Sequence, residues 1–226
     1  MCGRYNIITD AKALYDAFQV EAELNAGRLA RHNVAPATDQ MVIVDEDGGR
    51  AARWHRWGLI PHWAKDAAIG YKTINARGES VAAKPAFRAA FRQRRCLVPA
   101  TGFYEWKIEP GGTQPYLIRR ADGGLIAFAG LWESWAGPQG EVRSFTIITT
   151  APNALMQRIH DRMPVIIPRE RQARWLDPAL RDPAEIQSMI ASCPDGVLQA
   201  APVGREVNNA RNQGAELIEP IGPPVT

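Results

Sequence analysis

The sequence lacks the cysteine patterns that signal a disulfide framework or a zinc site. Only three cysteines occur among 226 residues, Cys2, Cys96 and Cys193, and no two of them form a CxxC pair. Widely spaced cysteines in odd number argue against a disulfide-stapled secreted fold, and a chain of this length can bury a core without such links. We therefore expect a reducing, cytoplasmic environment.

Membrane and metal signals are also missing. No apolar run approaches the roughly 18 residues of a membrane span. The opening stretch MCGRYNIITDAK lacks the basic-then-apolar order of a signal peptide. The four histidines show neither HExxH nor another paired ligand spacing. We expect no membrane partner, no metal site and no cofactor.

A strong excess of one charge is absent overall but present in one segment. The net charge of +3 is too small by itself to indicate a nucleic-acid partner. In KPAFRAAFRQRR, residues 84–95, five basic residues occur without an acid. A helix there would place Arg88, Arg92 and Arg95 on one face. Whether that face binds phosphate or is only solvated stays open.

Helical patterns lie on either side of a strand-rich middle. Apolar periodicity predicts a helix over residues 10–20, with Thr9 or Asp10 as its N-cap. Two short helices with proline near their starts are predicted over residues 168–176 and 182–191.

Strands separated by glycine turns fill the middle of the chain. Residues 41–60 read as a hairpin, and the segments 115–120, 125–132 and 142–150 read as a three-stranded meander. The predicted fold class is α+β. We expect a single domain over residues 1–226, built on a strongly curved, possibly barrel-like antiparallel sheet with flanking helices.

Cys2 directly follows Met1, and a residue this small ordinarily permits removal of the initiator methionine. Removal leaves a terminal cysteine that carries an α-amine and a thiol on adjacent carbons. The amine titrates near pH 7.7–8.0, at roughly neutral conditions, so part of it is nucleophilic. An aldehyde can form an imine with it, and the thiol can close a thiazolidine. The alternative is a buried, inert cysteine beside the first strand.

Three further motifs set reactive side chains beside turns or strand ends. In TINARGE, Asn75 and Arg77 alternate and would face one side of an extended segment. In GFYEWK, Glu105 stands between aromatics, where desolvation would raise its pKa. His160 precedes an apolar strand. Each has a plain alternative: a turn residue, a surface charge paired with Lys107, and a cap or core group. Together with Cys2 they could supply a nucleophile, an acid–base partner and an orienting group.

The motifs of the chain resemble, in order and over nearly its whole length, the SRAP (SOS response-associated peptidase) family. They are MCGRYN, NVAPAT, RWGLIPHWAKD, INARGES, CLVPATGFYEWK, FTIITTAPN, IHDRMPVI and NNARNQGAELIEP. The resemblance implies the SRAP fold and a covalent thiazolidine crosslink to abasic sites in single-stranded DNA, which shields the lesion during replication. It also implies self-removal of Met1, although an ordinary aminopeptidase could do the same. The expected partner is single-stranded DNA with abasic sites. The chain is expected to be a monomer that associates with the nucleoid when bound to DNA.

The resemblance carries four catalytic residues onto this chain. They are Cys2, Asn75, Glu105 and His160. Cys2 would form the crosslink, His160 would act on the sugar ring oxygen, and Glu105 would move a proton between the amine and solvent. Asn75 would orient the amine or the sugar.

Six residues in or near the matched motifs are predicted to contact DNA. They are Arg4, Trp63, Arg77, Trp106, Thr149 and Arg162. The arginines would neutralise phosphates and the threonine would add a neutral hydrogen bond. Each tryptophan would stack on a base, with core packing as the alternative.

Two other function classes fit parts of this pattern. A thiol peptidase or N-terminal-nucleophile hydrolase would use Cys2 on a carbonyl, with His160 as the base. A non-covalent single-strand DNA-binding module would need Cys2 only for packing. The family resemblance favours the crosslinking reading.

Overall fold

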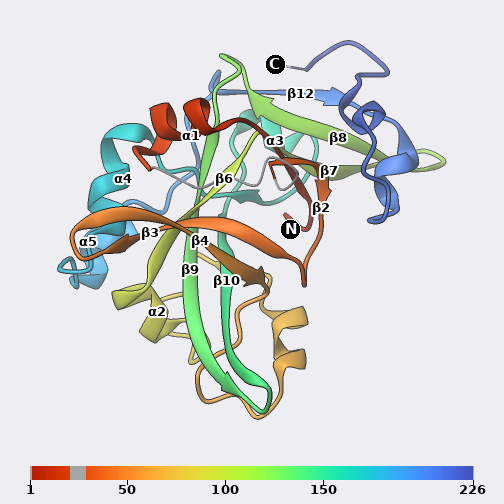
Figure 1. The fold of residues 1–226 in the computed structure, drawn as a ribbon. Coiled ribbons are helices and arrows are strands. Elements are labelled where there is room, and N and C mark those ends of the chain that lie inside the picture. Colours follow the sequence, from red (N-terminus) through yellow and green to blue (C-terminus); the bar gives the residue numbers. More distant parts are fainter. Residues whose placement is uncertain (1, 21–28, 226) are drawn as a thin grey trace.

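The computed structural model describes residues 2–20 and 29–225, and its architecture is built on two β-sheets (Figure 1). The strands are β1 (Tyr5–Ile8), β2 (Ala30–Val34), β3 (Asp39–Glu46), β4 (Gly49–Trp57), β5 (Asn75–Arg77), β6 (Arg95–Ala100), β7 (Gly102–Glu109), β8 (Gly112–Arg120), β9 (Ile126–Gly137), β10 (Gly140–Thr150), β11 (Met163–Pro164) and β12 (Leu198–Pro202). The helices are α1 (Ala11–Phe18), α2 (Arg88–Gln93), α3 (Ala154–Gln157), α4 (Arg169–Leu176) and α5 (Pro183–Ser188), with 3-10 turns η2 (Ala67–Lys72), η3 (Arg205–Asn208) and η4 (Ala215–Ile218).

Five strands close into a barrel. Around the ring, β10 pairs with β4, β4 with β3, β3 with β6, β6 with β9, and β9 again with β10. The predicted α+β fold with a barrel-like sheet is therefore confirmed. The expectation of a purely antiparallel sheet needs one correction, because β10 runs parallel to both β4 and β5.

A second, antiparallel sheet has the strand order β12-β8-β7-β1-β2. It corrects the predicted meander. The segment 115–120 lies in β8, which pairs with β7 and β12, whereas β9 and β10 form a hairpin in the barrel. The turn between β7 and β8 makes its own tight hairpin, and residues 121–125 carry the chain from one sheet to the other.

The flanking helices form where apolar periodicity and caps predict them. Asp10 is the N-cap of α1 and its carboxylate accepts from the backbone N–H of Ala13 at 2.8 Å. Leu14 and Phe18 of this helix are buried. Helices α4 and α5 lie in the two predicted segments.

The basic segment does not form one continuous helix. Helix α2 ends at Gln93, and Arg95 is the first residue of β6, where it is only 3% exposed. The prediction that Arg95 shares an exposed face with Arg88 and Arg92 is therefore wrong. Its guanidinium donates to the main-chain carbonyls of Phe91, Arg92, Trp175, Asp177 and Leu180.

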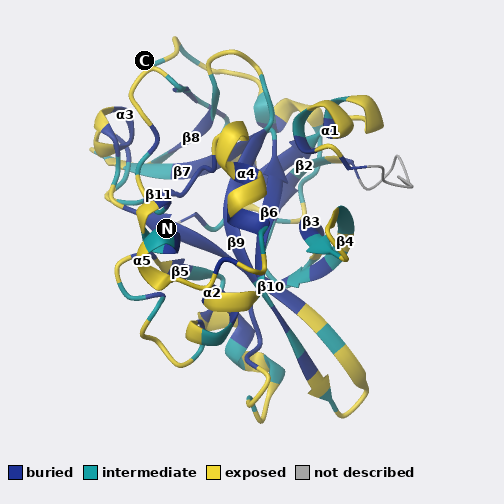
Figure 2. Ribbon diagram, turned by 90° about the vertical axis from the view of Figure 1, so that its left-hand side faces the viewer, coloured by how far each residue is buried: buried dark blue, intermediate teal, exposed yellow. Residues whose placement is uncertain are grey.

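The barrel strands divide their side chains between two apolar clusters. On β3, Val42 and Val44 join a cluster shared with the second sheet, whereas Met41 and Ile43 join one covered by α1, α2, α4 and α5. Successive side chains of a strand point to opposite faces, so this alternation means that β3 is buried on both faces. Figure 2 shows the strands of the barrel largely buried beneath exposed helices and loops. Within the described ranges, no helix has the length and apolarity needed to cross a bilayer.

Candidate functional site

Cys2 lies just before β1 and is fully buried. It belongs to the apolar cluster that the barrel shares with the second sheet, and its Sγ is 4.0 Å from the carbonyl oxygen of Arg4. Burial and the nearby charge of Glu105 raise the pKa of the Cys2 thiol well above its ordinary value. The thiol is therefore neutral, and Glu105 is its ionisable neighbour.

Glu105 stands on β7, within the second sheet. Its Cα pairs with Tyr116 of β8, and the residue is only 2% exposed. Burial raises the pKa of its carboxyl to about 7. The alternative of a surface charge paired with Lys107 does not hold, because Lys107 pairs instead with Glu109 at 3.3 Å. A buried carboxyl with this pKa can either hold or accept a proton at neutral pH.

His160 follows α3 and faces Glu105. The distance from His160 Nε2 to Glu105 Oε2 is 3.8 Å. The backbone N–H of Arg162 donates to His160 Nδ1 at 3.0 Å, which assigns the proton of the neutral ring to Nε2. Burial lowers the pKa of His160, so the neutral ring is favoured.

The Asp161 carboxylate lies close to His160 Nδ1, the same ring nitrogen that accepts from the Arg162 backbone. Asp161 Oδ1 also lies 3.0 Å from Nδ1, but its side chain is 87% exposed. A backbone donor is fixed in place, whereas an exposed side chain can turn away. We therefore take Nδ1 as the acceptor for Arg162, with Asp161 becoming its partner only when the ring is doubly protonated.

Asn75 reaches the site from the barrel. It begins β5 and pairs with Ile147 of β10, to whose carbonyl oxygen its Nδ2 donates at 3.4 Å. Its Oδ1 is buried and has no hydrogen-bond partner among the residues that the structure describes. Buried polar atoms are normally paired, so this oxygen is an acceptor available to an incoming group.

A cationic edge runs beside these residues. Arg77 ends β5 opposite Thr149 of β10 and is exposed. Arg162 donates from Nη2 to the Thr149 carbonyl at 2.7 Å and to Thr149 Oγ1 at 3.3 Å. Thr149 itself is fully buried. In this arrangement Thr149 supports Arg162, and Arg77 adds a second positive charge at the same edge of the sheet.

Arg4 and Trp106 contact the C-terminal part of the chain. Arg4 Nη1 donates to Asn33 Oδ1 at 2.8 Å and to the Val207 carbonyl at 2.9 Å. Its guanidinium carbon lies 6.0 Å from the centre of the Trp106 ring, and Trp106 Nε1 donates to Asn208 Oδ1 at 2.6 Å. Trp106 also packs against a small buried cluster, so this tryptophan has a structural role whether or not a base stacks on it.

A groove of about 640 Å³ opens directly beside His160. It is lined by Trp106, Lys107, Ile108, Pro152, Gln157, Arg158, Ile159, His160 and Asp161. Ile108 is 85% exposed at its rim. The groove combines an aromatic ring, the cationic side chains of Lys107 and Arg158, the histidine and the Asp161 carboxylate.

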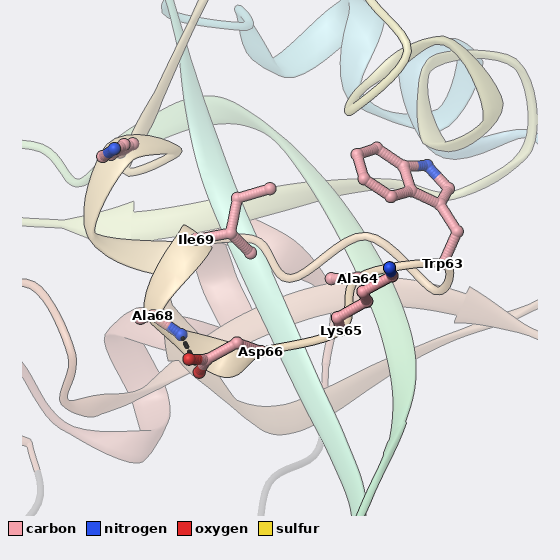
Figure 3. A pocket seen from close by; sticks show the side chains of 7 residues that line it. Trp63, Ala64, Lys65, Asp66, Ala68 and Ile69 are labelled. Atoms are coloured by element: carbon pink, nitrogen blue, oxygen red, sulfur yellow. Dashed lines mark hydrogen bonds between the residues drawn. The ribbon is translucent and has the colours of Figure 1, made fainter.

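Trp63 is not part of this cluster. It lies on the loop between β4 and β5, where it lines a separate pocket of about 480 Å³ with residues of η2. In Figure 3 its ring and the Ile69 side chain project toward the same side of the loop. Trp135 Nε1 donates to the Ala64 carbonyl at 2.7 Å and ties this loop to β9. Trp63 is 49% exposed.

Two residues of the site are not singled out by sequence reasoning. Glu79 forms a two-pronged ion pair with Arg162, and Asn33 holds Arg4. The available signal was their position inside the INARGES and NVAPAT motifs. In the described part of the chain, no three His, Cys, Asp or Glu residues are grouped closely enough to bind a metal.

The fold and site define a class of barrel protein in which a cysteine near the N-terminus is buried beside a glutamate–histidine pair. The sequence profile of the SOS response associated peptidase (SRAP) family matches residues 1–210, and the chain belongs to this family.

Named relatives and solved structures resemble nearly the whole chain. It is 41% identical over 222 residues to the abasic site processing protein YoqW of Bacillus subtilis, covering 97% of this chain and 99% of that protein. It is 31% identical over 227 residues to the abasic site processing protein YedK of Escherichia coli, covering 98% and 100%. A crystal structure of a protein from Bacteroides thetaiotaomicron matches with a TM-score of 0.87 and 26% identity, covering 97% and 100%.

Proposed function

We propose that this protein recognises abasic sites in single-stranded DNA. We further propose that, after removal of Met1, it forms a covalent thiazolidine crosslink to them through Cys2, which protects the lesion during replication. The observation that carries the proposal is the burial of Cys2 next to Glu105, whose carboxyl lies 3.8 Å from His160. Family membership and the names of the relatives support it.

The bond changes balance without an external oxidant or reductant. The Cys2 α-amine attacks C1′ of the open-chain sugar aldehyde to give a carbinolamine, which loses water and becomes an imine. The thiol sulfur then adds to the imine carbon while the thiol proton passes to nitrogen. The product is protein plus DNA less one water. Because its C1′ is saturated, it no longer promotes the strand-breaking elimination that a bare imine does.

Glu105 and His160 can transfer protons at two places, the ring oxygen of the sugar and the Cys2 amine. In its doubly protonated form, His160 can donate the Nε2 proton to the ring oxygen of the closed sugar while the 1′-hydroxyl loses its own proton, which opens the aldehyde and leaves the neutral ring. Glu105, with a pKa of about 7, can take a proton from the ammonium form of the amine and later return it. The Asn75 Oδ1 acceptor can orient the amine or a sugar hydroxyl.

The state of the Cys2 thiol argues against a thiol peptidase. Such enzymes need a thiolate, which requires a lowered pKa. In the chain with Met1 in place, burial and Glu105 raise the pKa of this thiol instead. A neutral thiol that attacks only after an imine has formed next to it fits the crosslinking reaction better.

DNA recognition without base reading fits the cationic edge and the groove. The lesion offers no base, so affinity must come from phosphates and from neighbouring bases. Arg77 and Arg162 provide positive charge at the edge of β5 and β10. Trp106 lines the groove beside His160, and Trp63 lies on its separate loop.

The first test is the intact mass of the protein before and after incubation with an oligonucleotide that carries one abasic site. We expect loss of the Met1 mass, followed by a heat-stable adduct equal to protein plus oligonucleotide less one water. Absence of an adduct with Met1 removed would rule out the crosslinking function.

Substitutions of Cys2 separate the remaining readings. Cys2→Ala retains the terminal amine and should give only a labile imine, whereas a passive binding module would retain DNA as well as the wild type. Cys2→Ser should form a less durable adduct, because oxygen closes the corresponding ring less favourably.

If Glu105→Gln retains Met1 in the same host, removal of Met1 is assigned to the chain itself; if it loses Met1, a host aminopeptidase suffices.

A further inference from the structure

The side chain of Glu79 occupies the anion-binding face of Arg162. Glu79 Oε1 accepts from Arg162 Nη1 at 2.5 Å, and Glu79 Oε2 accepts from Arg162 Nη2 at 3.0 Å. This is the two-pronged geometry by which arginine also holds a phosphate. The carboxylate therefore stands where two phosphate oxygens would lie.

The backbone beneath Glu79 is fixed. The N–H of Gly78 donates to the Thr149 carbonyl at 2.8 Å, and Gln187 Nε2 donates to the Gly78 carbonyl at 3.1 Å. A Cβ on Gly78 would come within 2.4 Å of Ile190 Cγ2, so the turn is packed tightly against the body of the protein. The backbone from which Glu79 extends is thus tied to β10 and to α5 through Gly78.

The side chains of the pair differ in exposure. Glu79 is 56% exposed, whereas Arg162 is 14% exposed and is held from behind by Thr149. Arg162 and the charge of Arg77 hold the pKa of the Glu79 carboxyl below its usual value, so it is ionised. A fixed cation thus faces a carboxylate that can rotate into solvent without moving the backbone.

We propose that Glu79 is a resident counter-ion that a backbone phosphate of the DNA must displace from Arg162, and that it thereby limits the affinity of this chain for DNA. The inference rests on the proposed function. The displacement sets a threshold, because a phosphate must outcompete a carboxylate that is already in place. Glu79 in this proposal tunes affinity and takes no part in the chemistry.

The test measures equilibrium binding of the full chain to a single-stranded oligonucleotide with a tetrahydrofuran abasic analogue, which has no aldehyde and cannot crosslink. Glu79→Gln preserves size and removes the charge. We expect it to tighten binding about three- to tenfold at low salt, with a gain that shrinks as salt rises. The plot of log affinity against log salt should accordingly be steeper for the variant.

Two comparisons separate the ion pair from net charge. In an Arg162→Gln background, adding Glu79→Gln should give a clearly smaller gain, because the cation paired with Glu79 is gone and only the more distant charge of Arg77 remains. Glu46→Gln is the matched control, since Glu46 forms an exposed two-pronged pair with Arg53 at the end of β3. Figure 2 places the β3–β4 hairpin on the side of the molecule away from β5. This control should leave DNA affinity within about twofold of wild type.

The outcomes are distinct from those of the crosslinking test. If Glu79→Gln binds no tighter, or gains as much in the Arg162→Gln background as alone, the counter-ion role is overturned while crosslinking by the wild type can still stand. An equal gain from Glu46→Gln would assign the effect to net charge and also overturn it. If the wild type does not bind the oligonucleotide at all, both the inference and the proposed DNA recognition fail.

Discussion

The buried carboxyl of Glu105 makes stability depend on pH. Folding raises its pKa from 4.5 to about 7. The fold therefore favours the protonated carboxyl. Its contribution to the free energy of unfolding is fully present below about pH 4.5 and is lost as pH rises through about 7. The loss amounts to about 3 kcal/mol.

Glu105→Gln should remove this dependence. The free energy of unfolding of the variant, relative to wild type, should rise by up to about 3 kcal/mol between about pH 4.5 and about pH 8, measured by urea unfolding. Glu109→Gln on the same strand is the control, because that side chain is 37% exposed. A similar trend in both variants would contradict the assignment to Glu105.

Single residues were predictable where their immediate neighbours decide their environment. Aromatics on either side of Glu105 predicted desolvation, and the residue is 2% exposed with a raised pKa. Arg95 was not predictable in this way, because its carbonyl partners include Trp175 and Leu180, which lie far along the chain. The approach of His160 to Glu105 is likewise a product of the fold. The catalytic and DNA-binding roles stay predictions.

Strands β6, β9 and β10 of the barrel meet closely at Gly130. A Cβ at this position would lie 2.7 Å from Cys96 Sγ, 3.0 Å from Val98 Cγ2 and 3.2 Å from the Thr146 carbonyl. β9 cannot move away from either neighbour, because it is hydrogen-bonded to β6 on one edge and to β10 on the other. The glycine is therefore needed for strand contact and not for an unusual backbone angle.

Gly130→Ala should lower the free energy of unfolding by about 1–3 kcal/mol through overpacking. Cys96→Ala, which removes the nearest atom, should recover part of that loss in the double variant. A double-mutant cycle from denaturant unfolding measures this coupling. Strictly additive effects would show that the sulfur does not limit the space at Gly130.

Elements were predicted better than their pairing. Local patterns indicated α1, α4, α5 and the β3–β4 hairpin, and each is present. The predicted meander failed because neighbours in sequence were taken as neighbours in space. β8 pairs with β7 on one edge and with β12, which comes much later in the chain, on the other. No local sequence pattern indicates the pairing with β12.

Asn33 connects the start of the molecule with its end. Its Nδ2 lies within hydrogen-bond distance of the carbonyls of Val207, Asn209 and Asn212, and its Oδ1 accepts from Arg4. The residue is 1% exposed. One amide thus fastens the C-terminal segment to β2 and, through Arg4, to the chain that leads into β1.

Asn33→Ala should destabilise the protein by about 1–3 kcal/mol, because the Asn209 and Asn212 carbonyls lose their Nδ2 donor and Arg4 Nη1 keeps only the Val207 carbonyl as an acceptor. Hydrogen exchange should accelerate most at the amides of Val203 and Ile221, which bond to the Pro115 and Pro202 carbonyls on either side of the segment that Asn33 holds. Asn208→Ala, which removes only the bond to Trp106, should have a smaller effect. Equal effects of the two variants would contradict the central role of Asn33.

The burial of Cys2 between both sheets has a consequence for how the protein is made. Cys2 leaves the ribosome first, yet Glu105 and His160 are translated much later. At about 5–20 residues per second, His160 is added about 10–30 s after synthesis begins. Until then Cys2 has neither Glu105 and His160 beside it nor its enclosure. Its terminus is open to processing enzymes during that interval, and the buried arrangement around it forms only after most of the chain has been made.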